Sequence, residues 1–252
     1  MLLVVALTLV PLWRLNGMNR GAIGFNGFSG RQFGASFLLA IGMLLPLMTL
    51  FLVGKFRLID PRVDYVSGEF LLTILTISVG ALLVALFEET LFRGFLQRLV
   101  GDRLGPRRAI LIISLFFGSV HFLEPTQTPP VHIDPMTGLM LIGYAFAGIT
   151  EGISNDFGSY ASLVGIGLIL GFAREKYGLW VPIALHAGWV FGIRFFKEMT
   201  VRDNFSPYAE WAGTYDNFIG PLAVFWLLFS FVLYRLYLRY RENTTGLLAS
   251  SK

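Results

Sequence analysis

The stretch FLLTILTISVGALLVALFEETLF, residues 70–92, decides the fold class of this protein. Residues 70–87 carry no charge, and a helix needs about 20 mainly apolar residues to cross a membrane. Glu88, Glu89 and Arg93 then follow where such a helix should still lie within the bilayer. Charged side chains inside a bilayer are costly and usually serve a function. The stretch therefore predicts a transmembrane helix with a charged cluster near its end.

The composition places the whole chain among membrane proteins. Of its 252 residues, 55% are hydrophobic and only 14% are charged, and the mean hydropathy is +0.66. The lack of cysteine excludes disulfides and cysteine-ligated metals. Basic residues in cytoplasmic loops explain the formal net charge of +4 at pH 7. Since the sequence has no aromatic and basic pattern typical of a single-strand groove, we expect no nucleic-acid partner.

Apolar stretches that could span a membrane recur along the sequence. They lie at residues 35–54, 70–92, 108–123, 158–173, 179–196 and 217–238, with a shorter one at residues 1–13. None has the alternation of polar and apolar residues that a transmembrane barrel requires, and the loops are short. We therefore predict one integral-membrane domain over residues 1–252, an all-α polytopic helical bundle of about seven or eight spans.

Residues 137–153, TGLMLIGYAFAGITEGI, are ambiguous between a further span and an interfacial or re-entrant helix. If they do not cross, one side of the membrane receives about twice as many basic residues as the other, whereas crossing makes the two sides nearly equal. The positive-inside rule therefore favours a segment that does not cross, a cytoplasmic C-terminus and a cytoplasmic loop at 98–107. The first residue then lies outside, so we expect that an upstream helix is missing.

Helix geometry divides the charged cluster into a pair and a single acid. Glu89 and Arg93 are four residues apart on one helical face, with the acid toward the N-terminus, so they can form an ion pair. Glu88 points about 100° away and has no cation on its own helix. The alternative is that all three charges form a salt-bridge cluster among the lipid headgroups.

Two of the three histidines also lie in apolar helices. His121 is near the end of its span and His186 is early in its span, whereas we expect His132 to be a solvated loop residue. Counting along the helices places Glu88 and His121 both roughly 20 Å from the loop near residue 103, but His186 only about 12 Å from that side. A single histidine in such a helix is usually a packing residue. Two of them beside an unpaired acid favour a functional site.

A carboxylate and two imidazoles in a partly dry pocket suit hydrolysis. Burial raises the proton affinity of a carboxylate, so Glu88 can take a proton from water near neutral pH. One imidazole can position that water, and the other can donate a hydrogen bond to the developing oxyanion. The same three side chains, Glu88, His121 and His186, could instead hold a divalent metal such as zinc.

Three motifs lie on successive predicted helices. EETLFR fits E-E-x-x-x-R at residues 88–93, FGSVH fits F-x-x-x-H at Phe117 and His121, and HAGWV begins like H-x-x-x-N/D at His186. Their order and spacing resemble the CPBP family of intramembrane proteases, the CAAX proteases and bacteriocin-processing enzymes. The resemblance covers about residues 70–196. It implies that this segment is the catalytic core of an endopeptidase with an all-helical membrane fold, with Phe117 as a supporting residue.

The resemblance also implies roles for the remaining motif residues. Glu88 would be the base that activates water, helped by His121, and His186 would serve the oxyanion. Glu89 and Arg93 would be the supporting pair. No cofactor is expected, with a divalent metal held by the three catalytic residues as the alternative.

The chain departs from the family pattern at one position. The fourth residue after His186 is Val190, where the family has Asn or Asp. Valine cannot donate a hydrogen bond, and the loss of one oxyanion donor costs about 100- to 1000-fold in rate. Asn155, Trp189 or a backbone N–H are the candidates to compensate. The departure leaves the fold prediction intact and the activity open.

Other classes of membrane protein fit the sequence less well. There is no H-E-x-x-H for a zinc protease, no G-x-G-D for an aspartyl protease, and Ser36 has no serine-type histidine motif after it. A transporter would show paired broken helices in the two halves of its sequence, and this sequence shows none. The main alternative is a non-catalytic membrane scaffold or bacteriocin-immunity protein that keeps the protease fold.

The expected partners follow from this interpretation. They are membrane lipid and a peptide or protein substrate that is membrane-associated or lipidated, while the use of prenylated substrates and the oligomeric state stay open. Short loops and a small size favour a bacterial inner membrane as the location.

Overall fold

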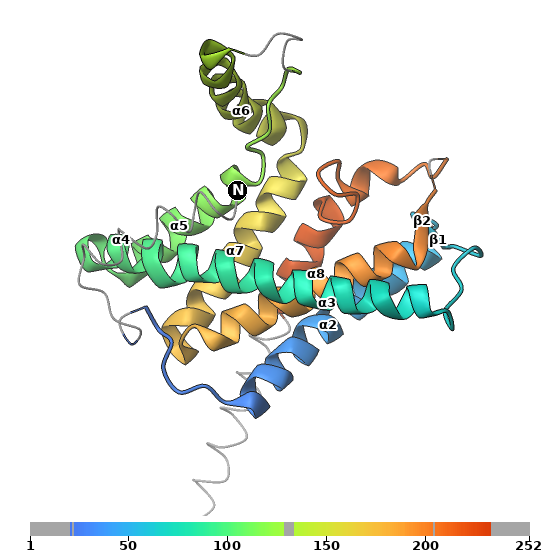
Figure 1. Ribbon diagram of the computed structural model, residues 1–252, viewed down its shortest axis with the longest axis horizontal. Coiled ribbons are helices and arrows are strands. Elements are labelled where there is room, and N and C mark those ends of the chain that lie inside the picture. The colour runs from blue at the N-terminus through green and yellow to red at the C-terminus, as the bar shows by residue number, and fades with distance from the viewer. Residues whose placement is uncertain (1–20, 22, 129–133, 204, 233–252) are drawn as a thin grey trace, which may run out of the picture.

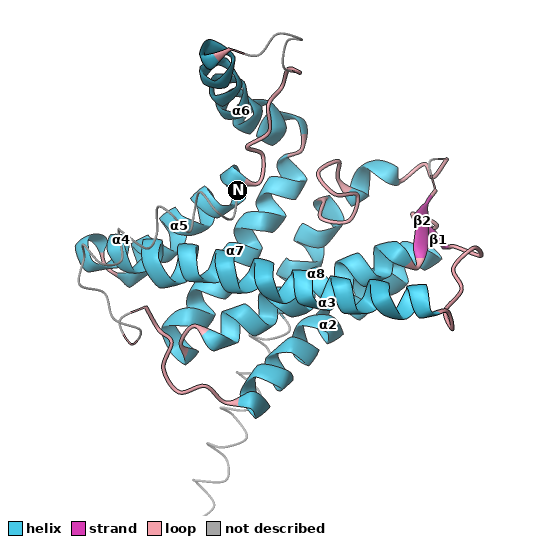
Figure 2. Ribbon diagram, in the orientation of Figure 1, coloured by secondary structure: helices cyan, strands magenta, loops and turns pink. Residues whose placement is uncertain are grey.

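The computed structural model describes residues 21, 23–128, 134–203 and 205–232. Nearly all secondary structure in these ranges is helical (Figures 1 and 2). The α-helices are α2 Gly30–Val53, α3 Gly68–Glu89, α4 Gln97–Leu104, α5 Pro106–Val120, α6 Pro135–Asn155, α7 Phe157–Tyr177 and α8 Trp180–Glu198. His132, the predicted span at 1–13 and the end of the last predicted span lie outside the described residues.

The all-α membrane fold predicted from the sequence is confirmed. In the described ranges, the helices long and apolar enough to cross a membrane are Gly30–Val53, Gly68–Leu104, Met136–Asn155 and Phe157–Tyr177. The predicted spans at 108–123 and 179–196 correspond to α5 and α8, which have 15 and 19 residues. A shorter apolar helix, Pro221–Val232, begins the last predicted span. The total of about seven spans stays a prediction.

Helix α6 covers the ambiguous segment and is continuous. Asp134 and Thr137 form a capping box at its start. Figure 1 shows α6 standing away from the other helices beyond the start of α7, and only 11% of its most apolar window is buried. Its length and composition suffice to cross a membrane, so the non-crossing position stays a prediction.

Helix α3 does not end where the sequence predicted. It passes into a π-helix, η1 Thr90–Leu96, and then into α4, and together they form one rod of 37 residues, Gly68–Leu104. Glu89 is the last residue of α3 and Arg93 lies within η1. A π-turn inserts an extra residue into a helix and is frequent at functional sites. The charged cluster therefore lies at an irregularity in the middle of a long helix and not at a helix end.

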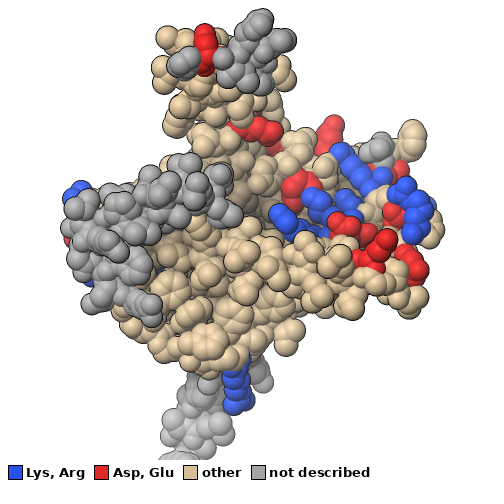
Figure 3. Space-filling view, viewed as in Figure 1, with Lys and Arg blue, Asp and Glu red and all other residues tan. Residues whose placement is uncertain are grey.

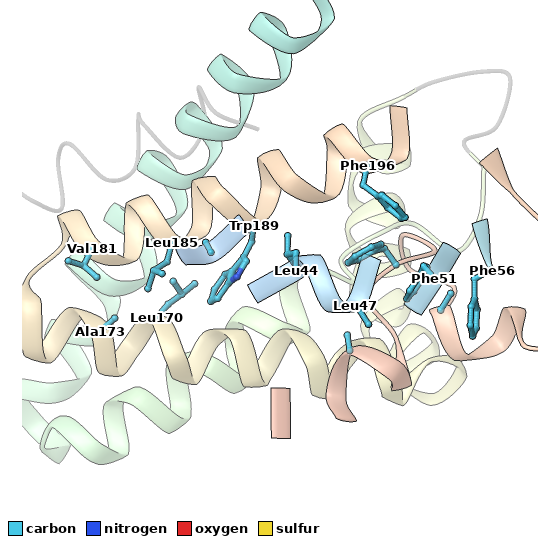
Figure 4. Packing of buried hydrophobic residues seen from close by; sticks show 14 residues of the cluster. Leu44, Leu47, Phe51, Phe56, Leu170, Ala173, Val181, Leu185, Trp189 and Phe196 are labelled. Carbon is cyan, nitrogen blue, oxygen red and sulfur yellow. The ribbon is translucent and has the colours of Figure 1, made fainter. Parts of the chain in front are cut away.

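Helix α8 lies at the centre of the bundle, with α2, α3 and α7 packed against it. Every residue from Val181 to Trp189 is buried. Trp189 lies in an apolar cluster with Leu44 of α2 (Figure 4). A Cβ on Gly188 would lie 2.5 Å from the carbonyl oxygen of Phe37, so only glycine allows α2 to approach this closely. Small residues at such contacts are typical of membrane helices.

A short two-stranded antiparallel sheet, not predicted from the sequence, joins the α2–α3 connection to the end of α8. Strand β1 Arg57–Ile59 pairs with strand β2 Thr200–Arg202. The buried Arg57 side chain donates to the carbonyl oxygens of Thr200 at 2.7 Å and Lys197 at 3.3 Å, which satisfies carbonyl groups at the end of α8. Strands of three residues are too short to show an alternating pattern.

The surface is divided into a charged end and an apolar face. In Figure 3 the Lys, Arg, Asp and Glu side chains gather at the end that carries strands β1 and β2, and most of the remaining visible surface is uncharged. Helix α3 exposes apolar side chains along its length, at Leu71, Leu72, Leu75, Val79, Leu82 and Leu83. An exposed apolar face of this extent is unusual in a soluble monomer and suits contact with lipid.

Candidate active site

The predicted pair of Glu89 and Arg93 forms in the interior of the bundle. Arg93 Nη1 donates to Glu89 Oε1 at 3.0 Å, and the two side chains are 1% and 0% exposed. The guanidinium also donates from Nη2 to the carbonyl oxygen of Gly167 on α7 at 3.4 Å. The alternative of a salt-bridge cluster among headgroups does not fit this degree of burial.

His186 is a second partner of Glu89, which sequence reasoning missed. Its Nδ1 lies 2.8 Å from Glu89 Oε1. Because a carboxylate accepts, Nδ1 carries the proton of this hydrogen bond. Its other nitrogen, Nε2, lies 4.0 Å from Oε2 of Glu88. Glu89 thus orients His186 so that Nε2 faces the neighbouring acid.

Glu88 is the acid without a bonded partner. Its side chain is 21% exposed, yet its Oε2 atom is buried and has no hydrogen-bond partner among the described residues. A buried acceptor without a partner is costly, so water or a substrate is expected to satisfy it. One water molecule can lie within hydrogen-bond distance of both Glu88 Oε2 and His186 Nε2, which are 4.0 Å apart. This geometry matches the role of the free acid that helix geometry predicted.

His121 lies at the end of α5, as the residue that follows Val120. Its Nδ1 is 2.7 Å from the carbonyl oxygen of Phe117, so Nδ1 is the donor and Nε2 is left free. Glu88 and His186 are both close enough for their charges to act on His121. The second histidine thus belongs to the same neighbourhood, although no direct hydrogen bond joins it to the other members within the described ranges.

Phe117 is the apolar contact that these side chains share. Its ring centre lies 4.5 Å from that of His121 and 6.2 Å from that of His186. The Arg93 guanidinium lies over the same ring, 4.2 Å from its centre, a cation–π distance. Phe117 is 1% exposed. Its buried ring therefore restricts the positions of the three side chains that pack against it.

Counting residues along the helices placed His186 nearer to the loop side of the membrane than Glu88 and His121. The packing of α8 corrects this prediction. The count assumed that α8 starts level with the loop near residue 103. Leu179, just before α8, instead packs against Gly94 within the rod, well before its end at Leu104, with Leu179 Cδ2 3.4 Å from where a Cβ on Gly94 would be. From this contact, Glu88 and His186 are both roughly 10 Å along their helices. They therefore lie at the same level.

A loop beyond α8 adds a residue that the sequence did not mark. The ring of Tyr215 stands edge-on to His121, with 5.9 Å between ring centres. Partial burial and the carboxylates of Asp216, Glu88 and Glu124 raise the pKa of Tyr215 to about 12. Tyr215 belongs to none of the three motifs and to no apolar repeat, so sequence reasoning had no signal for it.

The candidates to replace a donor at position 190 differ in their surroundings. Trp189 lies in the apolar cluster around Leu44 (Figure 4), which argues against a role at the acid and histidine site. Asn155 is an exposed residue at the end of α6. Val190 is half-buried in α8.

The described residues do not assemble a metal site. In these ranges no group of three or more His, Asp or Glu side chains is arranged to hold a metal ion. Glu88 Oε2 and His186 Nε2 lie 4.0 Å apart, and within the described residues no hydrogen bond joins His121 to either side chain. The divalent metal therefore stays an alternative proposal.

The fold and the cluster define a class, that of helical membrane proteins with an acid and histidine site inside the bundle. Residues 70–192, about half of the chain, match the family described as type II CAAX prenyl endopeptidase Rce1-like. These residues belong to this family, which confirms the resemblance found in the three motifs. At the family level the match implies a CAAX-type intramembrane peptide hydrolase. Neither the comparison with curated proteins nor that with solved structures gave a match.

Proposed function

We propose that this protein is an intramembrane endopeptidase that hydrolyses peptide bonds of membrane-associated or lipidated peptides. The observation that carries the proposal is the position of Glu88, whose buried Oε2 has no described partner and lies 4.0 Å from His186 Nε2. Glu89 also has a buried oxygen without a described partner, Oε2, but its other oxygen already accepts hydrogen bonds from Arg93 and His186. Glu88 accepts no such hydrogen bond from a described residue, so it is the acid better placed to hold and activate a water molecule.

The reaction starts with a water molecule between Glu88 and the two histidines. Glu88 takes one proton from the water molecule as the oxygen of that water attacks the carbonyl carbon of the peptide bond. His121 Nε2, left free because Nδ1 is bound to the Phe117 carbonyl, accepts the other hydrogen and orients the water. The attack converts the carbonyl oxygen into an oxyanion.

Glu89 and His186 stabilise that oxyanion together. In the protonated form of His186, Glu89 accepts the Nδ1 hydrogen at 2.8 Å and a second hydrogen lies on Nε2. The Nε2 hydrogen then points to the space beside Glu88 and donates to the oxyanion. When the C–N bond breaks, Glu88 gives its proton to the leaving amine. The products are a new carboxyl end and a new amino end.

The substrate and the cofactor requirement follow from the same site. The apolar surface of α3 and the position of the cluster within the bundle favour a substrate that approaches from the membrane, with or without a prenyl group. We propose that no cofactor is needed, that the protein lies in a bacterial inner membrane, and that its C-terminus is cytoplasmic. A divalent metal such as zinc on Glu88, His121 and His186 is the alternative for the chemistry.

A second candidate function is that of a non-catalytic scaffold or bacteriocin-immunity protein. It is favoured by one observation, the presence of Val190 where the family pattern has a donor or an acid. A scaffold would keep its cellular effect without Glu88, whereas the protease would not.

The experiment is a cleavage assay with purified protein in liposomes. It compares the wild type, Glu88→Gln and Glu151→Gln, with prenylated and unprenylated membrane peptides as substrates. Glu151 is an exposed acid on α6, so it controls for the loss of a charge. We expect Glu88→Gln to lower kcat by at least about 1000-fold and Glu151→Gln to leave it unchanged. Cleavage by Glu88→Gln at the wild-type rate would overturn the proposal, and loss of wild-type activity in a chelator, restored by zinc, would favour the metal alternative.

A further inference from the structure

The loop after α8 is tied firmly to the start of α7. The carboxylate of Asp156, which caps α7, accepts hydrogen bonds from the backbone N–H and hydroxyl groups of Thr214, the latter at 2.8 Å, and from the backbone N–H of Tyr215 at 3.2 Å. Gly213 has a positive φ of 76°, and a Cβ there would lie 2.5 Å from the Ser159 hydroxyl. Only glycine allows the loop to come this close. The backbone of Tyr215 is therefore held in one place.

The ring of Tyr215 is held as well. It stands edge-on to His121 at 5.9 Å and is tilted against Phe122 at 5.5 Å between ring centres. The hydroxyl group donates no hydrogen bond to any residue in the described ranges. About 40% of Tyr215 is exposed, so this donor remains accessible to a bound substrate. Its ring thus lies beside His121, one of the two histidines of the proposed site.

The hydroxyl group is suited to donate and not to act as a base. Three carboxylates, those of Asp216, Glu88 and Glu124, lie close enough for their charges to act on it, and together with partial burial they raise the pKa of Tyr215 to about 12. The phenol therefore keeps its proton throughout the neutral range.

We propose that Tyr215 donates a hydrogen bond to the oxyanion and so supplies the donor that Val190 lacks. This inference rests on the proposed function. His186 Nε2 and the Tyr215 hydroxyl would then hold the oxyanion from two elements, α8 and the loop that follows it. Tyr215 lies beyond residue 192, where the match to the family ends, so the family motifs do not provide this donor.

The decisive variants separate the hydroxyl group from the ring. Tyr215→Phe keeps the contact with His121 and removes only the donor. We expect kcat to fall about 100- to 1000-fold with little change in KM, and the melting temperature to stay within a few degrees. Tyr208→Phe is the matched control, because Tyr208 is an exposed tyrosine that packs on Phe56 near the other end of the same connection.

A second variant tests whether a hydrogen-bond donor at position 190 can replace the Tyr215 hydroxyl group. Val190→Asn places a donor where the family pattern has one. In the Tyr215→Phe background we expect Val190→Asn to recover at least about 10-fold of the lost rate, which a purely structural role of the hydroxyl group would not produce. An unchanged kcat in Tyr215→Phe overturns this inference but leaves the proposed function standing if Glu88→Gln is inactive. An active Glu88→Gln overturns the proposed function and this inference with it.

Discussion

At the scale of single residues, two adjacent glutamates have different surroundings. Glu89 is fully buried and shares one oxygen with Arg93 at 3.0 Å and His186 at 2.8 Å. Glu88 forms no hydrogen bond to a described residue, although the Oε2 atom is buried and without a partner in both acids. The helix turns by about 100° per residue, so neighbours in sequence face different parts of the bundle. The same residue type can therefore hold a structure together at one position and perform chemistry at the next.

This difference predicts that the same substitution affects stability strongly at one position and little at the other. Glu89→Gln leaves the buried charge of Arg93 without its counter-charge, and we expect it to lower the stability by about 3 kcal/mol or more. Glu88→Gln breaks no ion pair with an arginine or lysine and should change the melting temperature by no more than a few degrees. Thermal unfolding in detergent measures both.

The double variant Glu89→Gln/Arg93→Met is the control for this prediction. Because it removes the buried cation together with its partner, it should recover part of the lost stability. Equal melting temperatures for Glu89→Gln and the wild type would contradict the role given to Glu89.

Sequence reasoning could predict the residues of the site but not all of their contacts. The pairing of Glu89 with Arg93 follows from their spacing on one helix. The contact of Glu89 with His186 joins two helices that are far apart in sequence, and counting residues from a loop placed His186 too close to one side. The count failed because the relative offset of two helices depends on their packing, here of Leu179 against Gly94.

At the scale of elements, apolar runs locate the helices but not their irregularities. The long runs predicted α2, α3, α5, α7 and α8, because about 20 apolar residues are needed to span a membrane. The π-helix Thr90–Leu96 was missed, since its residues are also compatible with an ordinary α-helix. The two-stranded sheet of β1 and β2 was missed because its strands have only three residues each.

The attachment of the Tyr215 loop to α7 predicts a dependence on pH. Burial raises the pKa of Asp156, but hydrogen bonds from Thr214 and Ser159 outweigh this effect and hold the pKa below its ordinary value of 3.8. A carboxyl whose pKa is lowered by folding adds stability above its unfolded pKa, and this stability is lost as the pH falls toward the folded pKa. The loop should therefore stay attached near neutral pH and loosen below about pH 4.

Melting temperatures of the wild type and Asp156→Asn across about pH 3 to 7 measure this effect. We expect the melting temperature of the wild type to exceed that of the variant by an amount that is constant near neutral pH and shrinks below pH 3.8, the ordinary pKa of this carboxyl. The loss of a cap of this kind corresponds to about 1–2 kcal/mol. A difference that grows as the pH falls would contradict the prediction.

At the scale of the whole molecule, three separate helical regions bring their polar groups to one buried position. The rod supplies Glu88 and Glu89, the end of α5 supplies His121, and α8 supplies His186. The composition and motifs predicted a membrane bundle of this family, because both depend on local sequence. The closing loop with Tyr215 could not be predicted, since it is fixed by Asp156 more than fifty residues earlier in the chain.

In the proposed reaction Glu88 activates a water molecule and does not itself attack the peptide bond. A single turnover in water enriched in oxygen-18, followed by mass spectrometry of the product and of the protein, distinguishes the two routes. We expect one heavy oxygen in the new carboxyl end of the product and none in the peptide that contains Glu88. Heavy oxygen in the Glu88 side chain together with an unlabelled product, which hydrolysis of a covalent anhydride at the Glu88 carbonyl carbon would give, would overturn the proposed reaction.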